Sequence, residues 1–271
     1  MPGKSGFPSW DNSTAKPFDP TDCPEGATLL EKYSHIPRGD IADHVTSVAR
    51  RGWDIAGYPC FRRFLFLDMD VARSPHYTRI LERVKRGALF IDLGCGLGQD
   101  VRRLAFDGVP SENLYGLDLH SELVELGYEL FRDRETLKAT FLAQDFFEDT
   151  PLFRKIDKTL GVINSGYFMH LWDWEGQVKL GLRMVKMLAS GQEEGGLIVG
   201  VHFGLKRTKT VKTEDGREMF VHNSNSLLKM WGEIEGLAGR KLRVEVAVEE
   251  DERCRIYNPD TVRLRWSVLA E

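Results

Sequence analysis

The 271-residue sequence is poor in cysteine, and its four cysteines lie far apart. Cys23, Cys60, Cys95 and Cys254 form no C-x-x-C pair, the spacing that many zinc sites and redox dithiols use. No cluster of histidines and acids has metal-ligand spacing either. The sequence therefore predicts neither a disulfide framework nor a metal site. A reducing compartment is expected, which we take to be the cytoplasm.

Long apolar runs and an excess of basic residues are also absent. No window is apolar enough for a membrane span, and residues 1–20 lack an apolar core of signal-peptide length. The 37 Lys and Arg residues are outnumbered by 41 Asp and Glu residues, which gives a formal net charge of −4. This balance argues against a nucleic-acid binder that relies on a broad basic surface. We expect a soluble globular protein with neither a membrane nor a nucleic-acid partner.

Strand-like and helix-like segments alternate along most of the chain. Short apolar runs separated by helical patterns occur at residues 88–93, 113–119, 139–146, 159–165 and 195–203. Such alternation is typical of βαβ units and a parallel sheet. Two segments with alternating polar and apolar residues, 241–250 and 261–270, end the chain without a helix between them. We therefore predict an α/β fold with a Rossmann-like, mostly parallel sheet, helices on both faces and an antiparallel C-terminal hairpin.

Composition divides the chain into three parts. Residues 1–28 are rich in Pro, Gly, Ser, Asp and Thr, which predicts a flexible N-terminal arm. Residues 29–87 contain helical patterns and are interpreted as an N-terminal helical cap segment. Residues 88–271 carry the alternating pattern and form the main domain.

The stretch LFIDLGCGLGQD, residues 89–100, ends the first predicted strand in a glycine-rich turn. In an open parallel sheet, ligands bind outside the carboxyl ends of the strands. Gly94, Gly96 and Gly98 let the backbone approach such a ligand closely, and the following helix points N–H groups at it. The pattern is G-x-G-x-G, and it lacks the third glycine of the nicotinamide fingerprint G-x-G-x-x-G.

Acidic residues follow the same edge of the predicted sheet. Asp92 precedes the turn, and Asp118 ends the second strand, where its carboxylate can accept hydrogen bonds from two ribose hydroxyls. Asp145 ends the third strand between Gln144 and Phe146. An acid beside an aromatic ring suits an adenine, because the acid accepts from the exocyclic amine and the ring stacks.

These elements in this order resemble class I S-adenosylmethionine-dependent methyltransferases over about residues 85–271. The resemblance implies a seven-stranded sheet with an antiparallel last strand, and S-adenosyl-L-methionine as cofactor. It implies that Asp92 and the turn hold the methionine part, Asp118 the ribose, and Gln144 to Phe146 the adenine. The remaining residues of the expected cofactor set are Tyr33, Cys95, Leu119, Asn164 and Ser165.

A closer resemblance starts at about residue 31. YPCFRRFLFLDMD (58–70), DLGCGLGQDVRRLAFDGVPSENLYGLDL (92–119) and HLWDW (170–174) resemble small methyltransferases of fungal secondary-metabolite clusters, especially those of meroterpenoid pathways. This likeness implies O-methylation of a small-molecule acceptor, an aromatic or terpenoid–polyketide compound, often at a carboxyl group. Residues 204–224 match that pattern less well, and they lie where acceptor contacts are expected.

The stretch NSGYFMHLWDW, residues 164–174, is expected to face the acceptor. Phe168 and Trp172 are predicted to line its pocket, although the same aromatic residues also fit an ordinary core. His170 and His202 are the candidate catalytic bases. A carboxylate acceptor is already ionised near neutral pH and needs no base, whereas a phenol would be helped by one.

Two other classes of protein stay open on the sequence alone. A nicotinamide-dependent oxidoreductase would use a related sheet, but the missing glycine and the terminal hairpin argue against it. The second class is a partner subunit that binds the cofactor without catalysis. Stoichiometric cofactor binding without turnover of any acceptor would favour it. The oligomeric state is not fixed by the sequence, and a homodimer is one assembly that it allows.

Overall fold

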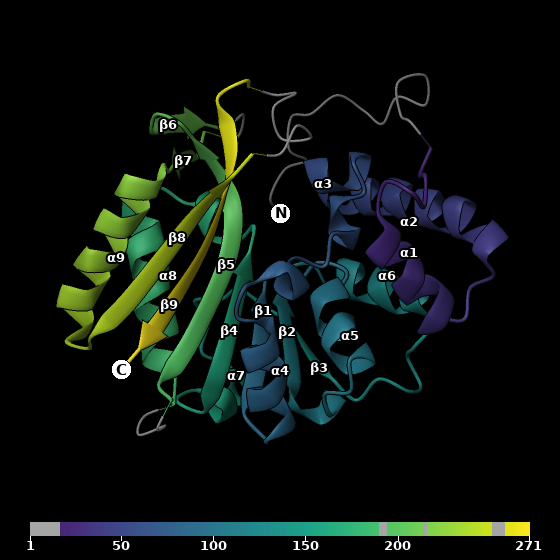
Figure 1. Ribbon diagram of the computed structural model, residues 1–271, viewed down its shortest axis with the longest axis horizontal. Coiled ribbons are helices and arrows are strands. Elements are labelled where there is room, and N and C mark those ends of the chain that lie inside the picture. Colours follow the sequence, from purple (N-terminus) through teal and green to yellow (C-terminus); the bar gives the residue numbers. More distant parts are fainter. Residues whose placement is uncertain (1–16, 190–193, 214–215, 251–257) are drawn as a thin grey trace.

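The computed structural model describes residues 17–189, 194–213, 216–250 and 258–271. The described residues form a seven-stranded sheet in the order β3-β2-β1-β4-β5-β9-β8, with helices on both faces (Figure 1). Its strands are β1 (Leu89–Leu93), β2 (Leu114–Asp118), β3 (Thr140–Ala143), β4 (Leu160–Gly166), β5 (Gly196–Leu205), β8 (Leu242–Glu249) and β9 (Thr261–Ala270). The predicted Rossmann-like architecture is confirmed.

Strand direction follows the sequence prediction. β1 to β5 are mutually parallel, whereas β9 runs antiparallel between β5 and β8. The strand order reverses at β1, whose neighbours are β2 on one side and β4 on the other. The carboxyl ends of β1 and β4 therefore flank the position at which open α/β sheets bind ligands.

Helices cover the two faces of the sheet in separate groups. One face carries α7 (Pro151–Ile156), α8 (Trp174–Met187) and α9 (Ser224–Ala238), and the other carries α4 (Tyr77–Lys85), α5 (Gln99–Phe106) and α6 (Ser121–Phe131) (Figure 1). Alternate residues of β5 supply the two cores: Ile198 packs with the α8 and α9 side chains, and Leu197 packs with those of α4 and α5. This alternation is the two-residue period of a strand buried on both faces.

The N-terminal segment packs as a helical cap on α6. Its helices are α1 (Pro24–Lys32), α2 (Ile41–Ala56) and α3 (Pro59–Arg62). They share an apolar core with α6 that includes Phe18 and Cys23. Part of the predicted arm therefore packs into this core, and residues 24–28 lie in α1, so the flexible arm was wrongly extended over residues 18–28. Residues 1–16 of that predicted arm lie outside the described part.

A hairpin after β5 was not predicted. β6 (Lys209–Lys212) pairs antiparallel with β7 (Glu218–Val221) as a separate two-stranded sheet. It lies toward the same end of the molecule as α3, where the parallel strands end (Figure 1). Among the described residues, no helix is long and apolar enough to cross a membrane. Cys23, Cys60 and Cys95 are free thiols, and Cys254 lies outside the described residues.

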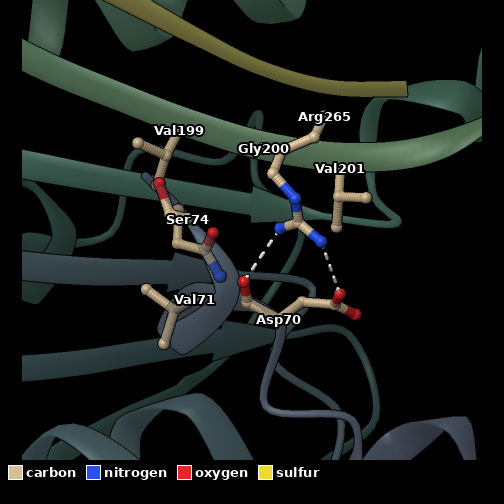
Figure 2. Close-up of a pocket in the computed structure, with 8 residues that line it drawn as sticks. Asp70, Val71, Ser74, Val199, Gly200, Val201 and Arg265 are labelled. Carbon is tan, nitrogen blue, oxygen red and sulfur yellow. Dashed lines mark hydrogen bonds and ion pairs between the residues drawn. The ribbon is translucent and has the colours of Figure 1, made fainter. Parts of the chain in front are cut away.

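Buried ion pairs attach the segment after α3 to β9. The Arg265 guanidinium donates to the Asp70 carbonyl oxygen at 3.0 Å and to Asp70 Oδ1 at 3.4 Å (Figure 2). Arg263 pairs with Asp68 at 3.4 Å. All four side chains are buried, and Arg263 also pairs with Asp70 at 3.6 Å, so the charges form a connected network. The cavity beside Arg265 and Asn164 holds only about 10 Å³, roughly the space of one water molecule.

The close fit of β5 to β9 generates a stability prediction. A Cβ at Gly200 would lie 2.2 Å from Trp266 Cζ2 and 2.8 Å from the Ser165 carbonyl oxygen. Gly200→Ala should therefore lower the free energy of unfolding by about 1–3 kcal/mol, measured by urea denaturation. Gly232, exposed on α9, is the matched control, because a Cβ there meets no described atom within 4 Å. Gly232→Ala should raise stability by about 0.5–1 kcal/mol. Equal effects of the two changes would contradict this account.

Candidate functional site

The glycine turn between β1 and α5 has a backbone that only glycine adopts easily. Gly94, Gly96 and Gly98 have φ values of +68°, +53° and +69°. A Cβ at Gly94 would lie 2.6 Å from Phe168 Cδ2, whereas a Cβ at Gly96 would meet no described atom within 4 Å. The turn is thus packed on one side and open at Gly96. An open, glycine-lined backbone at the switch point of the sheet fits a ligand that approaches the main chain closely.

Asp118 lies at the end of β2 and holds this turn. Its Oδ2 accepts the Gly96 N–H at 2.8 Å, and its Oδ1 accepts the His120 N–H at 3.0 Å. Burial raises the pKa of Asp118, and these two backbone hydrogen bonds oppose that shift. A carboxylate has about four lone-pair sites, so two backbone bonds leave capacity for ligand hydroxyls. Leu119 follows with 54% of its side chain exposed, so an apolar surface borders the acid.

Asp92 and Asn164, predicted separately, form a pair in the structure. Asn164 Nδ2 donates to Asp92 Oδ1 at 2.8 Å, between β4 and β1. Both side chains are buried. Burial and the nearby Asp100 carboxylate raise the pKa of Asp92 well above its usual range. Ser165 points to the opposite face of the sheet, and its buried Oγ has no hydrogen-bond partner among the described residues.

The loop after β3 differs from its predicted arrangement. Gln144 is buried, with its Oε1 accepting from Thr150 Oγ at 2.7 Å and its Nε2 donating to the Glu148 carbonyl at 3.2 Å, so its amide stabilises the loop itself. Phe146 is buried in the core, so its ring was wrongly expected to stack on a ligand. Phe147, next to it, has an exposed ring instead, and exposed Asp145 accepts its N–H at 2.8 Å. The sequence pattern could not tell which of two adjacent phenylalanines faces outward.

The segment after β4 brings aromatic rings to the glycine turn. Phe168 packs directly against Gly94, and the Trp172 ring lies edge-on to Phe168, with centroids 4.8 Å apart. Trp172 also lies edge-on to the exposed Phe147 ring, with ring centroids 6.3 Å apart. Phe168 and Trp172, predicted to line an acceptor pocket, therefore lie beside the turn, with Phe168 almost fully buried.

Two of the predicted residues point away from the turn's open side. The Cys95 thiol is buried toward Gly116 of β2, and only its backbone belongs to the turn. Tyr33 does not reach the glycine backbone: its hydroxyl donates to Asp133 Oδ2 at 2.8 Å.

Two residues near Asp118 were missed. The Asp118 carboxylate contributes to the raised pKa of Tyr58 and of Cys60, although burial is the larger cause in both. Tyr58 also lies edge-on to His120. Both follow α2 in the cap, and Arg217 of the β6–β7 hairpin lowers the pKa of Tyr58. Neither residue belongs to a periodic pattern that could have marked it.

The two candidate bases lie close together, with ring centroids 6.1 Å apart. Trp266 Nε1 donates to His202 Nδ1 at 3.4 Å. An indole N–H can only donate, so Nδ1 accepts, and in the neutral ring the hydrogen sits on Nε2. His202 then has no free lone pair and is a poor general base, contrary to the sequence expectation. Burial lowers its pKa well below the usual range and lowers the pKa of His170 to about 4.

Comparison with known proteins agrees with this geometry. Residues 17–67 match the family model of the meroterpenoid methyltransferase N-terminal domain, and residues 90–191 match a methyltransferase domain. The O-methyltransferase atr3 of Stereocaulon alpinum is 37% identical over 89% of this chain and 69% of its own. The asnovolin E/chermesin D methyltransferase nvfJ of Aspergillus novofumigatus is 37% identical over 80% of this chain and 78% of its own.

A solved structure shares the fold. The 1,6-didemethyltoxoflavin-N1-methyltransferase of Burkholderia thailandensis is 13% identical, with a TM-score of 0.53 over 87% of this chain and 92% of that one. From the domain matches and the relatives, the chain belongs to the S-adenosylmethionine-dependent O-methyltransferase family of fungal meroterpenoid biosynthesis.

Proposed function

We propose that the acceptor atom is a carboxylate oxygen of a small aromatic or terpenoid–polyketide compound, so that the product is a methyl ester. The observation that supports this choice is the state of the two histidines beside the expected acceptor position. A phenol has a pKa of about 10, and a base whose conjugate acid has a pKa of about 4 is poorly matched to it. A carboxylate is already ionised near pH 7 and needs only to be positioned.

The cofactor is expected to bind at the open side of the glycine turn. S-adenosylmethionine supplies a methyl group on a positively charged sulfur, which keeps the electron pair of the broken S–C bond when the acceptor oxygen takes the methyl. In this proposal Asp118 accepts from the ribose hydroxyls, and the Gly96 backbone lies against the ligand. Asp145 and the Phe147 ring border the adenine, and Asp92 lies on the methionine side.

The acceptor is expected to enter between the cap and the β6–β7 hairpin. Arg217 of the hairpin lowers the pKa of Tyr58 in the cap, which supports a hairpin residue within electrostatic range of a cap residue. Phe168 and Trp172 supply apolar surface on the side of the turn. The names of two relatives, an O-methyltransferase and a methyltransferase of asnovolin E and chermesin D, support an oxygen nucleophile and a meroterpenoid-type acceptor.

A phenol acceptor is the second candidate. It is favoured by one observation: His170 Nδ1 is buried and has no hydrogen-bond partner within the described ranges. A lone pair there could take a proton, although burial makes the charged ring costly.

The cofactor placement predicts the effect of removing the Asp118 carboxylate. Asp118→Ala deletes a charged acceptor, and each hydrogen bond to a charged group contributes roughly 1.5–3 kcal/mol. The dissociation constant of S-adenosylhomocysteine, measured by titration calorimetry, should rise at least about tenfold. Glu122→Ala removes an exposed acid four residues away and should leave it unchanged. A wild-type constant in Asp118→Ala would show that the ribose is held elsewhere.

The carboxylate proposal predicts the pH dependence of turnover. His170 has its pKa lowered to about 4, so its ring is already neutral throughout pH 6–8 and its titration cannot change the rate there. With a carboxylic acid acceptor, kcat should stay flat between about pH 6 and 8. His170→Ala and His202→Ala should mainly raise the acceptor KM.

The same measurement separates the second candidate. A phenol acceptor that depends on His170 should lose about 10²–10⁴-fold in kcat in His170→Ala, with cofactor binding intact. His44, whose Nε2 contacts the Leu130 carbonyl oxygen at 3.0 Å at the cap, provides the control variant His44→Ala. A rise of kcat with pH that disappears only in His170→Ala would overturn the carboxylate proposal.

A further inference from the structure

A buried arginine donates hydrogen bonds to two carbonyl oxygens of the glycine turn. Arg102 lies on α5, and only 1% of its side chain is exposed. Its Nη1 donates to the Leu97 carbonyl oxygen at 2.7 Å and to the Gly98 carbonyl oxygen at 3.3 Å. Both carbonyls belong to the turn. The contact is close, because a Cβ at Gly98 would lie 2.6 Å from the same nitrogen. The guanidinium therefore fixes the path of the backbone through the turn.

The Asp133 carboxylate holds the Arg102 guanidinium in place. Arg102 Nε and Nη2 donate to the two Asp133 carboxylate oxygens at 2.7 and 3.0 Å, a two-point contact that sets the orientation of the planar group. The Phe131, Tyr128 and Phe141 rings surround it, with centroids 4.7 to 5.3 Å from its central carbon. Asp133 is buried as well, so neither charge is solvated well enough to be stable without the other.

Tyr33 connects the Arg102–Asp133 pair to the N-terminal helical cap. It follows the last residue of α1 and lies 100 positions before Asp133 in the chain, yet its hydroxyl donates to Asp133 Oδ2 at 2.8 Å. Burial, and then the Asp133 carboxylate, raise the pKa of Tyr33, so the phenol keeps its hydrogen at neutral pH. A continuous series of hydrogen bonds thus runs from α1 through Asp133 and Arg102 to the carbonyls of the turn.

We propose that Tyr33 and Arg102 are positioning residues through which the N-terminal helical cap sets the affinity of the glycine turn for the cofactor. The inference rests on the proposed placement of the cofactor at this turn. Three glycines with positive φ give the turn little stiffness of its own, so its shape depends on the groups that hold it. The N-terminal helical cap then contributes to cofactor binding through a residue that does not contact the turn itself.

The chain contains a matched control for this arrangement. The Tyr77 hydroxyl donates to Asp107, and Arg103 Nε donates to the same carboxylate at 2.7 Å. These are the same three residue types, and Arg103 is the neighbour of Arg102 on α5. Among the hydrogen bonds of the described residues, however, none joins Arg103 to the glycine turn. Tyr77→Phe removes an equivalent hydroxyl without touching the proposed connection.

The test compares Tyr33→Phe with Tyr77→Phe in the full chain. Removal of one hydrogen bond should weaken S-adenosylhomocysteine binding about three- to tenfold in Tyr33→Phe, measured by titration calorimetry, and leave it unchanged in Tyr77→Phe. The midpoint of thermal unfolding should fall by a similar amount in both variants. At saturating cofactor, the acceptor KM of Tyr33→Phe should equal that of the wild type. Arg102→Lys keeps the charge but loses the two-point contact, and it should weaken cofactor binding further.

A double variant tests whether Tyr33 acts through Arg102. In the Arg102→Lys background, Tyr33→Phe should cause little additional loss of affinity, because the connection is already broken. Fully additive losses would mean that Tyr33 acts independently of Arg102, which would overturn the proposal. A wild-type dissociation constant in Tyr33→Phe would also overturn it. If Asp118→Ala binds normally too, the placement of the cofactor at the turn fails with it; if Asp118→Ala loses affinity, only the coupling fails.

Discussion

The glycine turn keeps its shape because charged side chains hold its backbone from two directions. Asp118 accepts the Gly96 N–H, while Arg102 donates to the carbonyls of Leu97 and Gly98. Glycine loses more conformational freedom on folding than any other residue, so a turn built on three of them is ordered only at an entropic cost. Groups that are themselves fixed by burial offset that cost. The site is therefore organised by its surroundings before a ligand arrives, which is the condition for tight binding.

The N-terminal helical cap is attached to the rest of the fold at separate points. Its apolar core is shared with α6, and Tyr33 reaches Asp133 from α1. The segment after α3 is tied to β9, where Arg265 contacts Asp70. Movement of the cap relative to the sheet would break buried ion pairs and hydrogen bonds, so we expect the two parts to behave as one unit.

The architecture could be predicted because its signals are local. The strand–turn–helix period and the two alternating terminal segments are visible in consecutive residues, and the carboxyl ends of parallel strands necessarily meet. The contacts that organise the site are not local. Nothing in the sequence near Tyr33 indicates a hydrogen-bond partner 100 positions away. Two adjacent phenylalanines likewise do not reveal that Phe146 is buried and Phe147 exposed. The tautomer of His202 on β5 depends on Trp266 on β9. These two strands pair in the sheet, although the two residues are 64 positions apart in the chain.

Buried carboxyl groups beside the turn contribute to its electrostatics. Asp92, Asp100 and Asp118 are all buried, and burial raises the pKa of each, to about 7 for Asp100. Asp100 and Asp118 both add to the shift at Asp92, whereas the polar group that opposes it, Asn164, is neutral. A cation placed among these carboxylates would lower the energy of their ionised forms. S-adenosylmethionine carries a positive sulfur and its demethylated product does not. With the cofactor placed at the glycine turn as proposed, these carboxylates favour binding of the charged methyl donor over its uncharged product, and so favour product release.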